Sequence, residues 1–176
     1  MVWLRVVLGV LVGVPALLYA TGLLIPRDHA AMMEITLASP PERVWALISD
    51  FPDTARWRDD VSHVDLLPAE GGPLLFVEVS SNGTVTYEVV SQEPPRLQVV
   101  RVVDDGQPFG GTWTWTTEPD GASSRVSILE QGFVRSPLFR VMARLFFPPT
   151  RTMDAYLRAL ARELGESAAP REVPAS

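Results

Sequence analysis

The hydrophobic and polar positions of this chain change period several times, and these changes outline its elements. An apolar run over residues 31–39 has the alternation of a strand. The apolar positions of the next segment follow helical spacing and comprise Val44, Trp45, Leu47 and Ile48. Another apolar strand is expected over residues 61–67. The pattern therefore predicts a strand, a helical connection and a second strand.

The helical connection carries the start and stop signals of two short helices. Ser39 and Glu42 have the spacing of a capping box, and Pro40 between them suits the first helical position. Residues 50–53 end this helix and begin a second one that finishes near Trp57. We therefore expect two short helices after the first strand.

Turn signals divide the middle of the chain into further strands. These strands are expected at residues 74–80, 84–90, 97–103, 111–117 and 124–133. Asn82-Gly83 is a strong hairpin signal between the first two of them. Trp113 and Trp115 alternate with threonines, so both indoles should lie on one face of their strand. With the two earlier strands, the pattern gives about seven antiparallel strands.

A long helix is expected near the carboxyl end. Ser136-Pro137 has the residues of a helix start, apolar positions then recur at helical spacing, and Gly165 suits the helix end. Pro148-Pro149 must kink or break this helix, because proline lacks the backbone N–H and clashes with the preceding turn. The tail, residues 166–176, is small, polar and proline-containing, and we expect it to be disordered.

This order of elements resembles the SRPBCC superfamily, the START/Bet v1-like helix-grip proteins, and within it the polyketide cyclase/dehydrase and lipid-transport group. The resemblance rests on the stretch from Ser39 to Val61 and on the strands and long helix that follow. It implies an α+β fold over residues 27–165, in which a curved antiparallel sheet grips the C-terminal helix. It also implies an apolar cavity between the sheet and that helix.

The amino-terminal segment is almost continuously apolar from Val6 to Ile25. About 20 residues at a rise of about 1.5 Å cross a bilayer core of about 30 Å. The pattern therefore predicts a transmembrane helix over residues 1–26 and a single-pass membrane protein. A cleaved signal peptide and a soluble core helix are the alternatives. Arg5 before the run, and Arg27 beside Asp28 after it, favour a domain outside the cytoplasm.

Composition excludes several kinds of chemistry. Hydrophobic residues make up 47% of the chain and charged residues 20%, which favours a packed core. The chain has no cysteine and only His29 and His63 as histidines, so we expect neither a metal site nor a cofactor. All fifteen basic residues are arginine, which excludes a lysine Schiff base. A net charge of −6 argues against a nucleic-acid partner.

Alternation along the strands and the facing of the C-terminal helix select candidates for the cavity lining. Cavities that bind small molecules are lined mainly by apolar and aromatic side chains with a few polar groups. The candidates are Phe76, Tyr87, Trp113, Trp115, Met142, Phe146 and Tyr156. The alternative is that these residues only fill the core.

Ionisable residues interrupt the strands at four places: Glu78, Glu88, Arg101 and Glu130. An inward-facing one would need a partner or a ligand, because a lone buried charge is costly, whereas an outward-facing one is ordinary surface. Glu78 and Glu88 flank the Asn82-Gly83 turn and are candidates for neighbouring carboxylates. Such carboxylates, or His63, would suit acid–base chemistry. No catalytic motif is recognised, so no residue is assigned a catalytic role.

Five arginines of the C-terminal helix are regularly spaced: Arg140, Arg144, Arg151, Arg158 and Arg162. On an unbroken helix they fall within about 40° of arc, opposite the apolar stripe. Beside a membrane anchor, this stripe predicts contact with anionic lipid headgroups. A solvated helix face is the alternative.

Three functional hypotheses follow. The leading one is a membrane-anchored protein that holds a hydrophobic small molecule or lipid in the cavity without catalysis. The second is an enzyme resembling polyketide cyclases or dehydratases, with cavity carboxylates or His63 as acid and base. The third is a protein-interaction module without a cavity. Two facing ionisable groups inside the cavity would favour the enzyme.

Overall fold

The computed structural model describes residues 2–68, 71–81, 83–103, 106–146 and 148–175. The helices are α1 (Val2–Leu24), α2 (Pro41–Ile48), α3 (Thr54–Trp57), α4 (Pro137–Phe146) and α5 (Pro149–Glu163). The strands are β1 (Asp28–Leu37), β2 (Val61–Leu67), β3 (Leu75–Ser80), β4 (Gly83–Glu93), β5 (Leu97–Val102), β6 (Phe109–Asp120), β7 (Ser123–Val134) and β8 (Arg171–Val173).

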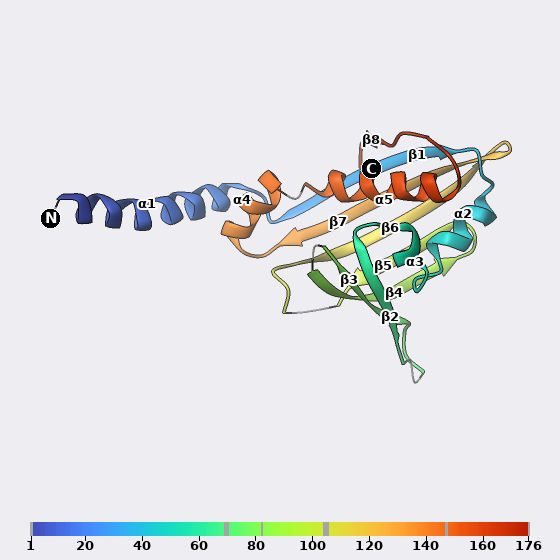
Figure 1. The fold of residues 1–176 in the computed structure, drawn as a ribbon, viewed down its shortest axis with the longest axis horizontal. Helices are drawn as coiled ribbons and strands as arrows, with labels where there is room; N and C mark the ends of the chain where they lie inside the picture. Colours follow the sequence, from blue (N-terminus) through green and yellow to red (C-terminus); the bar gives the residue numbers. More distant parts are fainter. Residues whose placement is uncertain (1, 69–70, 82, 104–105, 147, 176) are drawn as a thin grey trace.

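The described strands form one antiparallel sheet of eight strands in the order β2-β3-β4-β5-β6-β7-β1-β8. The sheet curves around α5, and α2 and α3 lie at the end of the sheet opposite α4 (Figure 1). The predicted α+β helix-grip arrangement is therefore confirmed, with one strand more than expected. The hairpin residue Asn82 lies outside the described residues, but β3 and β4 on either side pair Ser80 with Gly83.

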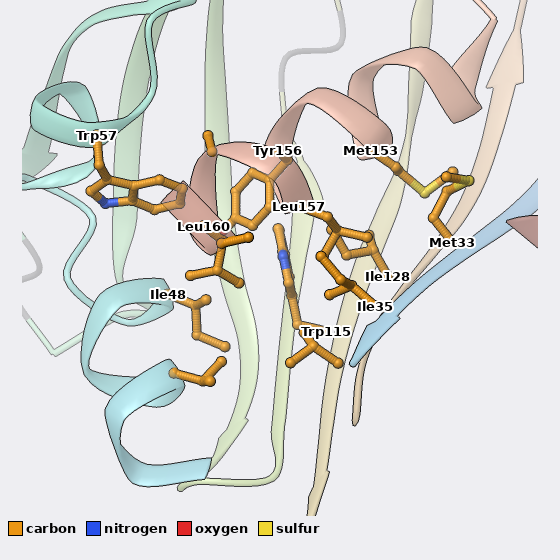
Figure 2. Close-up of a cluster of buried hydrophobic side chains, with 14 of the residues drawn as sticks. Met33, Ile35, Ile48, Trp57, Trp115, Ile128, Met153, Tyr156, Leu157 and Leu160 are labelled. Carbon is orange, nitrogen blue, oxygen red and sulfur yellow. The ribbon is translucent and has the colours of Figure 1, made fainter. Parts of the chain in front are cut away.

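The core lies between the sheet and α5. Met33 and Ile35 alternate to one face of β1, where they are buried. Met153, Leu157 and Leu160 form the helical stripe of α5, and all three are fully buried. Figure 2 shows these side chains facing one another across the gap between strand and helix. The two-residue alternation of β1 and the helical spacing of α5 thus place their apolar side chains in one shared layer of the core.

The two short helices after β1 are confirmed, but their start differs from the predicted capping box. Pro40 is the N-cap of α2, and no side chain caps it. The Ser39 hydroxyl instead donates a hydrogen bond to Oε1 of Glu166, at 2.7 Å. The capping box is therefore wrong, because a carboxylate from the distant tail accepts the Ser39 hydroxyl and backbone N–H hydrogens.

The tail also departs from the expected disorder. Arg171–Val173 form β8, which pairs antiparallel with β1 and places Arg171 opposite Glu34. The Arg171 guanidinium donates to the Glu34 carboxylate at 2.7 Å. The short strand and the Glu166 contacts therefore hold the tail against the edge strand β1, which would otherwise expose unpaired backbone groups.

The expected break in the C-terminal helix is confirmed. α4 ends at Phe146 and α5 begins at Pro149, with Pro148 as its N-cap. Proline at the first position of α5 costs no hydrogen bond, since that N–H has no partner inside a helix. The predicted long helix is therefore two helices, and only α5 packs into the centre of the sheet.

The amino-terminal segment forms α1, which extends away from the sheet (Figure 1). Among the described residues, no helix has both the length and the apolar character that crossing a membrane requires. The predicted transmembrane helix over residues 1–26 is therefore wrong, and so is the predicted single-pass membrane localisation. The end of α1 packs against α4, where Gly22 lets the backbone of Pro137 approach closely.

Candidate functional site on the inner face of the sheet

We call the sheet face covered by α5 the inner face. Its side chains follow from strand alternation and register: Trp113 lies opposite Glu130 on β7, and Trp115 lies opposite the core residue Ile128. Phe76 lies opposite Tyr87 on the neighbouring strands β3 and β4. Aromatic side chains from β3, β4 and β6 therefore point to the same side, toward α5.

The inner-face aromatic rings contact one another around Tyr156 of α5. Its ring centroid lies 5.3 Å from that of Trp57, 5.7 Å from that of Trp115 and 6.3 Å from that of Trp113. Figure 2 shows Tyr156 next to Trp57 and Trp115. On the other side, Phe76 stacks on Tyr87 at 5.1 Å. Edge-to-face and offset contacts of this kind are favourable for aromatic pairs.

The structure brings together five of the seven predicted lining residues: Phe76, Tyr87, Trp113, Trp115 and Tyr156. It does not bring Met142 and Phe146 to them. These two lie on α4, where their side chains are exposed. The reason is the break before α5: α4 packs against α1 and does not continue along the inner face.

A buried ionic cluster adjoins the aromatic rings. The side chain of Arg58 is only 9% exposed and lies with its guanidinium 5.2 Å from the ring centre of Tyr156. It donates hydrogen bonds to Glu78 at 2.8 Å and to both carboxylate oxygens of Asp60, at 2.6 and 3.2 Å. Glu78 is 13% exposed. The buried cation is therefore matched by two carboxylates and by an aromatic face.

Burial shifts the pKa of several groups in this region. It raises the pKa of the Glu78 carboxyl above its ordinary value, although Arg58 acts in the opposite direction. Burial would lower the pKa of Arg58, but Glu78 and Asp60 outweigh it and keep the guanidinium charged. Burial also raises the pKa of the Tyr87 and Tyr156 hydroxyls, so both stay neutral at physiological pH.

Three buried polar atoms have no hydrogen-bond partner within the described residues. They are the indole nitrogens of Trp57 and Trp115 and the hydroxyl of Thr117. Trp57 and Trp115 both contact the ring of Tyr156. Buried donors without acceptors cost free energy. The Trp115 N–H is the less isolated of the two indole groups, because it lies near the Tyr156 hydroxyl.

A second ionisable pair lies on the inner face, at the end of the sheet nearest α4. Nε2 of His29 on β1 lies 3.0 Å from Oε1 of Glu130 on β7. The side chain of His29 is 33% exposed and that of Glu130 is 18% exposed. Sequence reasoning considered Glu130 as a single strand carboxylate and did not consider His29. The structure shows that Glu130 faces inward and has a histidine partner.

Two glycines form the sheet surface beside this pair. Gly132 lies opposite His29 on one side and opposite Gly111 on the other. A Cβ at Gly132 would come within 2.7 Å of the imidazole ring of His29. Gly111 has a φ of 147°, which residues with side chains rarely adopt, and its Cβ would come within 2.4 Å of the Gln131 carbonyl oxygen. We call Gly111 and Gly132 the glycine floor, because neither position carries a side chain of its own; the imidazole of His29 lies over Gly132.

Two hollows adjoin the glycine floor. One has a volume of about 430 Å³, and its lining includes Val102, Gly111 and Phe133. The other has a volume of about 500 Å³, and its lining includes His29, Gly132 and Phe133. Between the sheet and the middle of α5, by contrast, the aromatic rings pack against one another. Most of the other lining residues, Arg101, Thr112, Gln131, Asp28 and Ala30, alternate to the sheet face away from α5, so both hollows open mainly on that outer face, at the α4 end of the sheet.

The other ionisable candidates do not face α5. Glu88 and Arg101 lie opposite each other on β4 and β5, form an ion pair, and alternate with the inward-facing Tyr87 and Val100. His63 on β2 is 55% exposed and lies 3.4 Å from Asp65. Glu78 lies opposite Val85 and Glu88 lies opposite Leu75, so these carboxylates are not neighbours across the hairpin. The suggested roles of His63 and of a Glu78–Glu88 pair are therefore wrong.

The five arginines of the C-terminal stripe are divided between α4 and α5, so they do not lie on one continuous helix. Arg140 donates to the backbone oxygens of Gly22 and Ile25 at the end of α1. Arg158 pairs with Asp154, and Arg162 pairs with Asp59. Arg144 and Arg151 complete the stripe. Contact of these arginines with a lipid surface stays a prediction.

Sequence reasoning missed Arg58 and His29. Arg58 lies just after α3, in a connection where no period defines a face. His29, however, is an even number of residues from the inward-facing Met33 and Ile35 on β1. Alternation alone could therefore have placed it on the inner face. Its partner Glu130 is 101 residues away, and only the β1–β7 register brings the two together.

Solved structures with this fold include enzymes. The Zhui aromatase/cyclase from Streptomyces sp. R1128 is 15% identical and superposes with a TM-score of 0.67 over 78% of this chain and 94% of that chain. Norcoclaurine synthase from Thalictrum flavum, in complex with dopamine and hydroxybenzaldehyde, is 11% identical with a TM-score of 0.63 over 82% and 90%. At such identities these similarities show the fold alone.

A START superfamily protein from Mycobacterium smegmatis is 14% identical, with a TM-score of 0.61 over 80% of this chain and 98% of that chain. No curated protein shows significant sequence similarity to the chain. Residues 29–165, most of the chain, match the family described as polyketide cyclase / dehydrase and lipid transport. Together with the helix-grip fold, this match shows that the chain belongs to that family.

Proposed function

We propose that this protein binds a hydrophobic small molecule, such as a lipid or an aromatic compound, on the inner face of its sheet. The observation that carries the proposal is the convergence of aromatic side chains from several elements on Tyr156 of α5. Binding sites for small molecules combine such apolar surfaces with a few polar groups. The inner face also supplies polar groups in the His29–Glu130 pair.

The α4 end of the inner face is the most suitable place for the ligand. The two glycines of the floor carry no side chains of their own, and His29 and Glu130 beside them are only partly buried. Trp113 lies one pair of residues further along β6, opposite Glu130, and is only partly buried. A ligand on the floor would therefore contact the Trp113 ring while leaving the packed centre of the core intact.

The relatives support small-molecule binding as the general use of this fold. The structure of norcoclaurine synthase contains two small aromatic molecules, dopamine and hydroxybenzaldehyde. The family description covers both enzymes and lipid transport. Binding is common to these activities, so we propose binding as the function and leave chemistry as a second candidate.

Uptake of 4-propylanisole by the full-length chain, measured by equilibrium dialysis, tests the proposal. Trp113→Ala should weaken binding about fivefold, because a ring that stacks on the ligand contributes on the order of 1 kcal/mol. Met142→Ala is the matched control, since Met142 lies exposed on α4, away from the inner face. Circular dichroism of both variants would show whether the fold is kept.

Two results would contradict the proposal. The first is that the wild-type chain takes up no probe. The second is that Met142→Ala weakens uptake as much as Trp113→Ala, because the probe would then be bound by exposed apolar side chains of α4 and not by the inner face.

Acid–base catalysis is the second candidate function. It is favoured by one observation: two of the carboxylates considered in the sequence, Glu78 and Glu130, face inward. Glu78 is matched by Arg58 and has little exposure, so it is less available to a ligand than Glu130. Turnover of a carbonyl compound by the wild-type chain, and its loss in Glu130→Gln, would favour this candidate over binding alone.

A further inference from the structure

We propose that His29 and Glu130 form a recognition site for an aromatic hydroxyl group, so that the natural ligand is a phenol-type molecule. This inference rests on the proposed binding function, because it names the chemical class of molecule that the inner face would hold. It is carried by three observations: the direction of the hydrogen bond within the pair, the glycine floor, and the position of Trp113.

The hydrogen bond between the two side chains determines which histidine nitrogen can bind a ligand. Nε2 of His29 lies 3.0 Å from Oε1 of Glu130. An ionised carboxylate can only accept, so Nε2 must carry the hydrogen and donate it. In the neutral imidazole the other nitrogen, Nδ1, is then an acceptor with a free lone pair. Nδ1 has no hydrogen-bond partner among the described residues.

The Nδ1 acceptor of His29 is held in place by Glu130 and Gly132, the two neighbours of the imidazole ring. Glu130 fixes the ring through Nε2, in the way that a carboxylate commonly orients a histidine. Gly132 makes room for the ring, since a Cβ there would come within 2.7 Å of Cε1 and 2.8 Å of Nε2. The pair is therefore a prearranged acceptor on a rigid strand and not a mobile surface side chain.

The surroundings of the pair favour a flat ligand. Gly111 and Gly132 lie side by side across β6 and β7; the imidazole of His29 lies over Gly132, and Gly111 beside it carries no side chain. Trp113 lies opposite Glu130 in the next row of the inner face. A planar ring that lies over Gly111 can contact the indole of Trp113 with its apolar part. Its edge then faces the imidazole.

The group at that edge should be a hydrogen-bond donor. A ligand O–H that donates to Nδ1 satisfies the acceptor, whereas a carbonyl or ether oxygen at the same place would leave two acceptors facing each other. A phenolic hydroxyl is a stronger donor than an aliphatic one because it is the more acidic group. The carboxylate of Glu130 also stabilises any positive charge that the imidazole gains from such a donor.

A matched pair of probes isolates the hydroxyl group. 4-Propylphenol and its methyl ether, 4-propylanisole, share the ring and the apolar chain and differ in the donor. The wild-type full-length chain should bind the phenol about tenfold more tightly in equilibrium dialysis, since the ether forfeits one hydrogen bond to a partly buried acceptor. His29→Ala should lower this preference to near unity while binding of the ether changes little. His63→Ala is the control, because His63 is exposed on β2 and should leave the preference unchanged.

A second variant leaves both functional groups in the chain. Gly132→Ala should reduce the preference for the phenol as strongly as His29→Ala, because the added Cβ displaces the imidazole from its place beside Glu130. Gly72→Ala is its control, since nothing lies within 4 Å of a Cβ at Gly72. Retention of the full preference in Gly132→Ala would overturn the positioning role of the glycine floor.

The outcomes separate this inference from the proposed function. If the wild-type chain binds both probes equally, or if His29→Ala keeps the preference, the hydroxyl site is wrong and binding of hydrophobic molecules stands. If the wild-type chain binds neither probe, both are wrong. A tenfold preference that His29→Ala abolishes and His63→Ala retains supports both.

Discussion

The two ionisable clusters of the inner face differ in how completely their groups are satisfied. The guanidinium of Arg58 is 9% exposed, is bonded to two carboxylates and lies over the Tyr156 ring. His29 is 33% exposed, makes one hydrogen bond through Nε2, and has an acceptor left over. The second cluster is thus the more exposed of the two and keeps a ring nitrogen that has no hydrogen-bond partner among the described residues.

This difference separates structural charges from functional ones. A buried cation that is matched by two carboxylates stabilises one arrangement of the core and is expensive to uncover. A half-exposed pair with one unused acceptor costs little to keep and gains a partner when a ligand arrives. We therefore assign the Arg58 cluster to the fold and the His29–Glu130 pair to recognition.

Removing the buried cation should have the largest effect. Arg58→Met leaves Glu78 buried without its partner, and breaking such a pair typically costs about 3–5 kcal/mol of the free energy of unfolding. Guanidinium unfolding of the full-length chain at neutral pH would measure the loss. The double variant Arg58→Met/Glu78→Leu should recover most of it, because no buried charge remains.

Arg56→Met is the matched control for this substitution. Arg56 lies two residues earlier and also bridges two carboxylates, Asp53 and Glu163, but its side chain is 53% exposed. Water screens such exposed pairs, so the loss should be far smaller than for Arg58. Equal losses in the two variants would contradict the distinction between a sealed cluster and a surface pair.

The glycine floor should be the next most sensitive place. Gly111→Ala forces a residue with a side chain into a φ of 147° and brings its Cβ within 2.4 Å of a backbone oxygen. Strain of this kind costs about 1–3 kcal/mol. Chemical unfolding would measure it, with Gly72→Ala as the unstrained control. A neutral effect of Gly111→Ala would mean that the floor is not constrained to bare backbone.

The charge on Glu78 should make stability depend on pH. Burial raises its folded-state pKa above the ordinary value of 4.5, so between these two values the folded protein holds more protons than the unfolded one. The contribution of Glu78 to stability therefore falls as pH rises through this range, by at most about 1.4 kcal/mol per pH unit. Glu78→Gln lacks the titrating group, so its unfolding free energy should lose this slope. A wild-type slope that Glu78→Gln keeps would contradict the raised pKa.

Much of the fold could be predicted from the sequence because its signals are local. Alternation placed Trp113 and Trp115 on one face, and Pro148 marked the end of a helix from its own chemistry. The number of strands was nearly right, and the missing one, β8, has only three residues. A three-residue strand has no period that a sequence pattern can show.

The site was harder to predict because it depends on register and packing. His29 and Glu130 become partners only when β1 pairs with β7, and no local pattern determines that pairing. Met142 and Phe146 continue the apolar stripe of α5 in sequence, but the break lets α4 turn toward α1. Local periodicity identifies which side chains share one face of a helix or strand. Which other element packs against that face depends on how the whole chain folds.

Among these substitutions, His29→Ala should have the smallest effect on stability and the largest effect on recognition of the ligand hydroxyl. His29→Ala removes one hydrogen bond from a side chain that is 33% exposed, and a pair of this exposure contributes about 0.2–1 kcal/mol. The unfolding free energy should therefore change by less than about 1 kcal/mol, while the preference for 4-propylphenol over its ether is lost. Chemical unfolding and equilibrium dialysis on the same sample would measure both, with His63→Ala as the control. If His29→Ala instead destabilised the chain as much as Arg58→Met, the His29–Glu130 pair would be a second structural cluster, and the contrast between the two ends of the inner face would be lost.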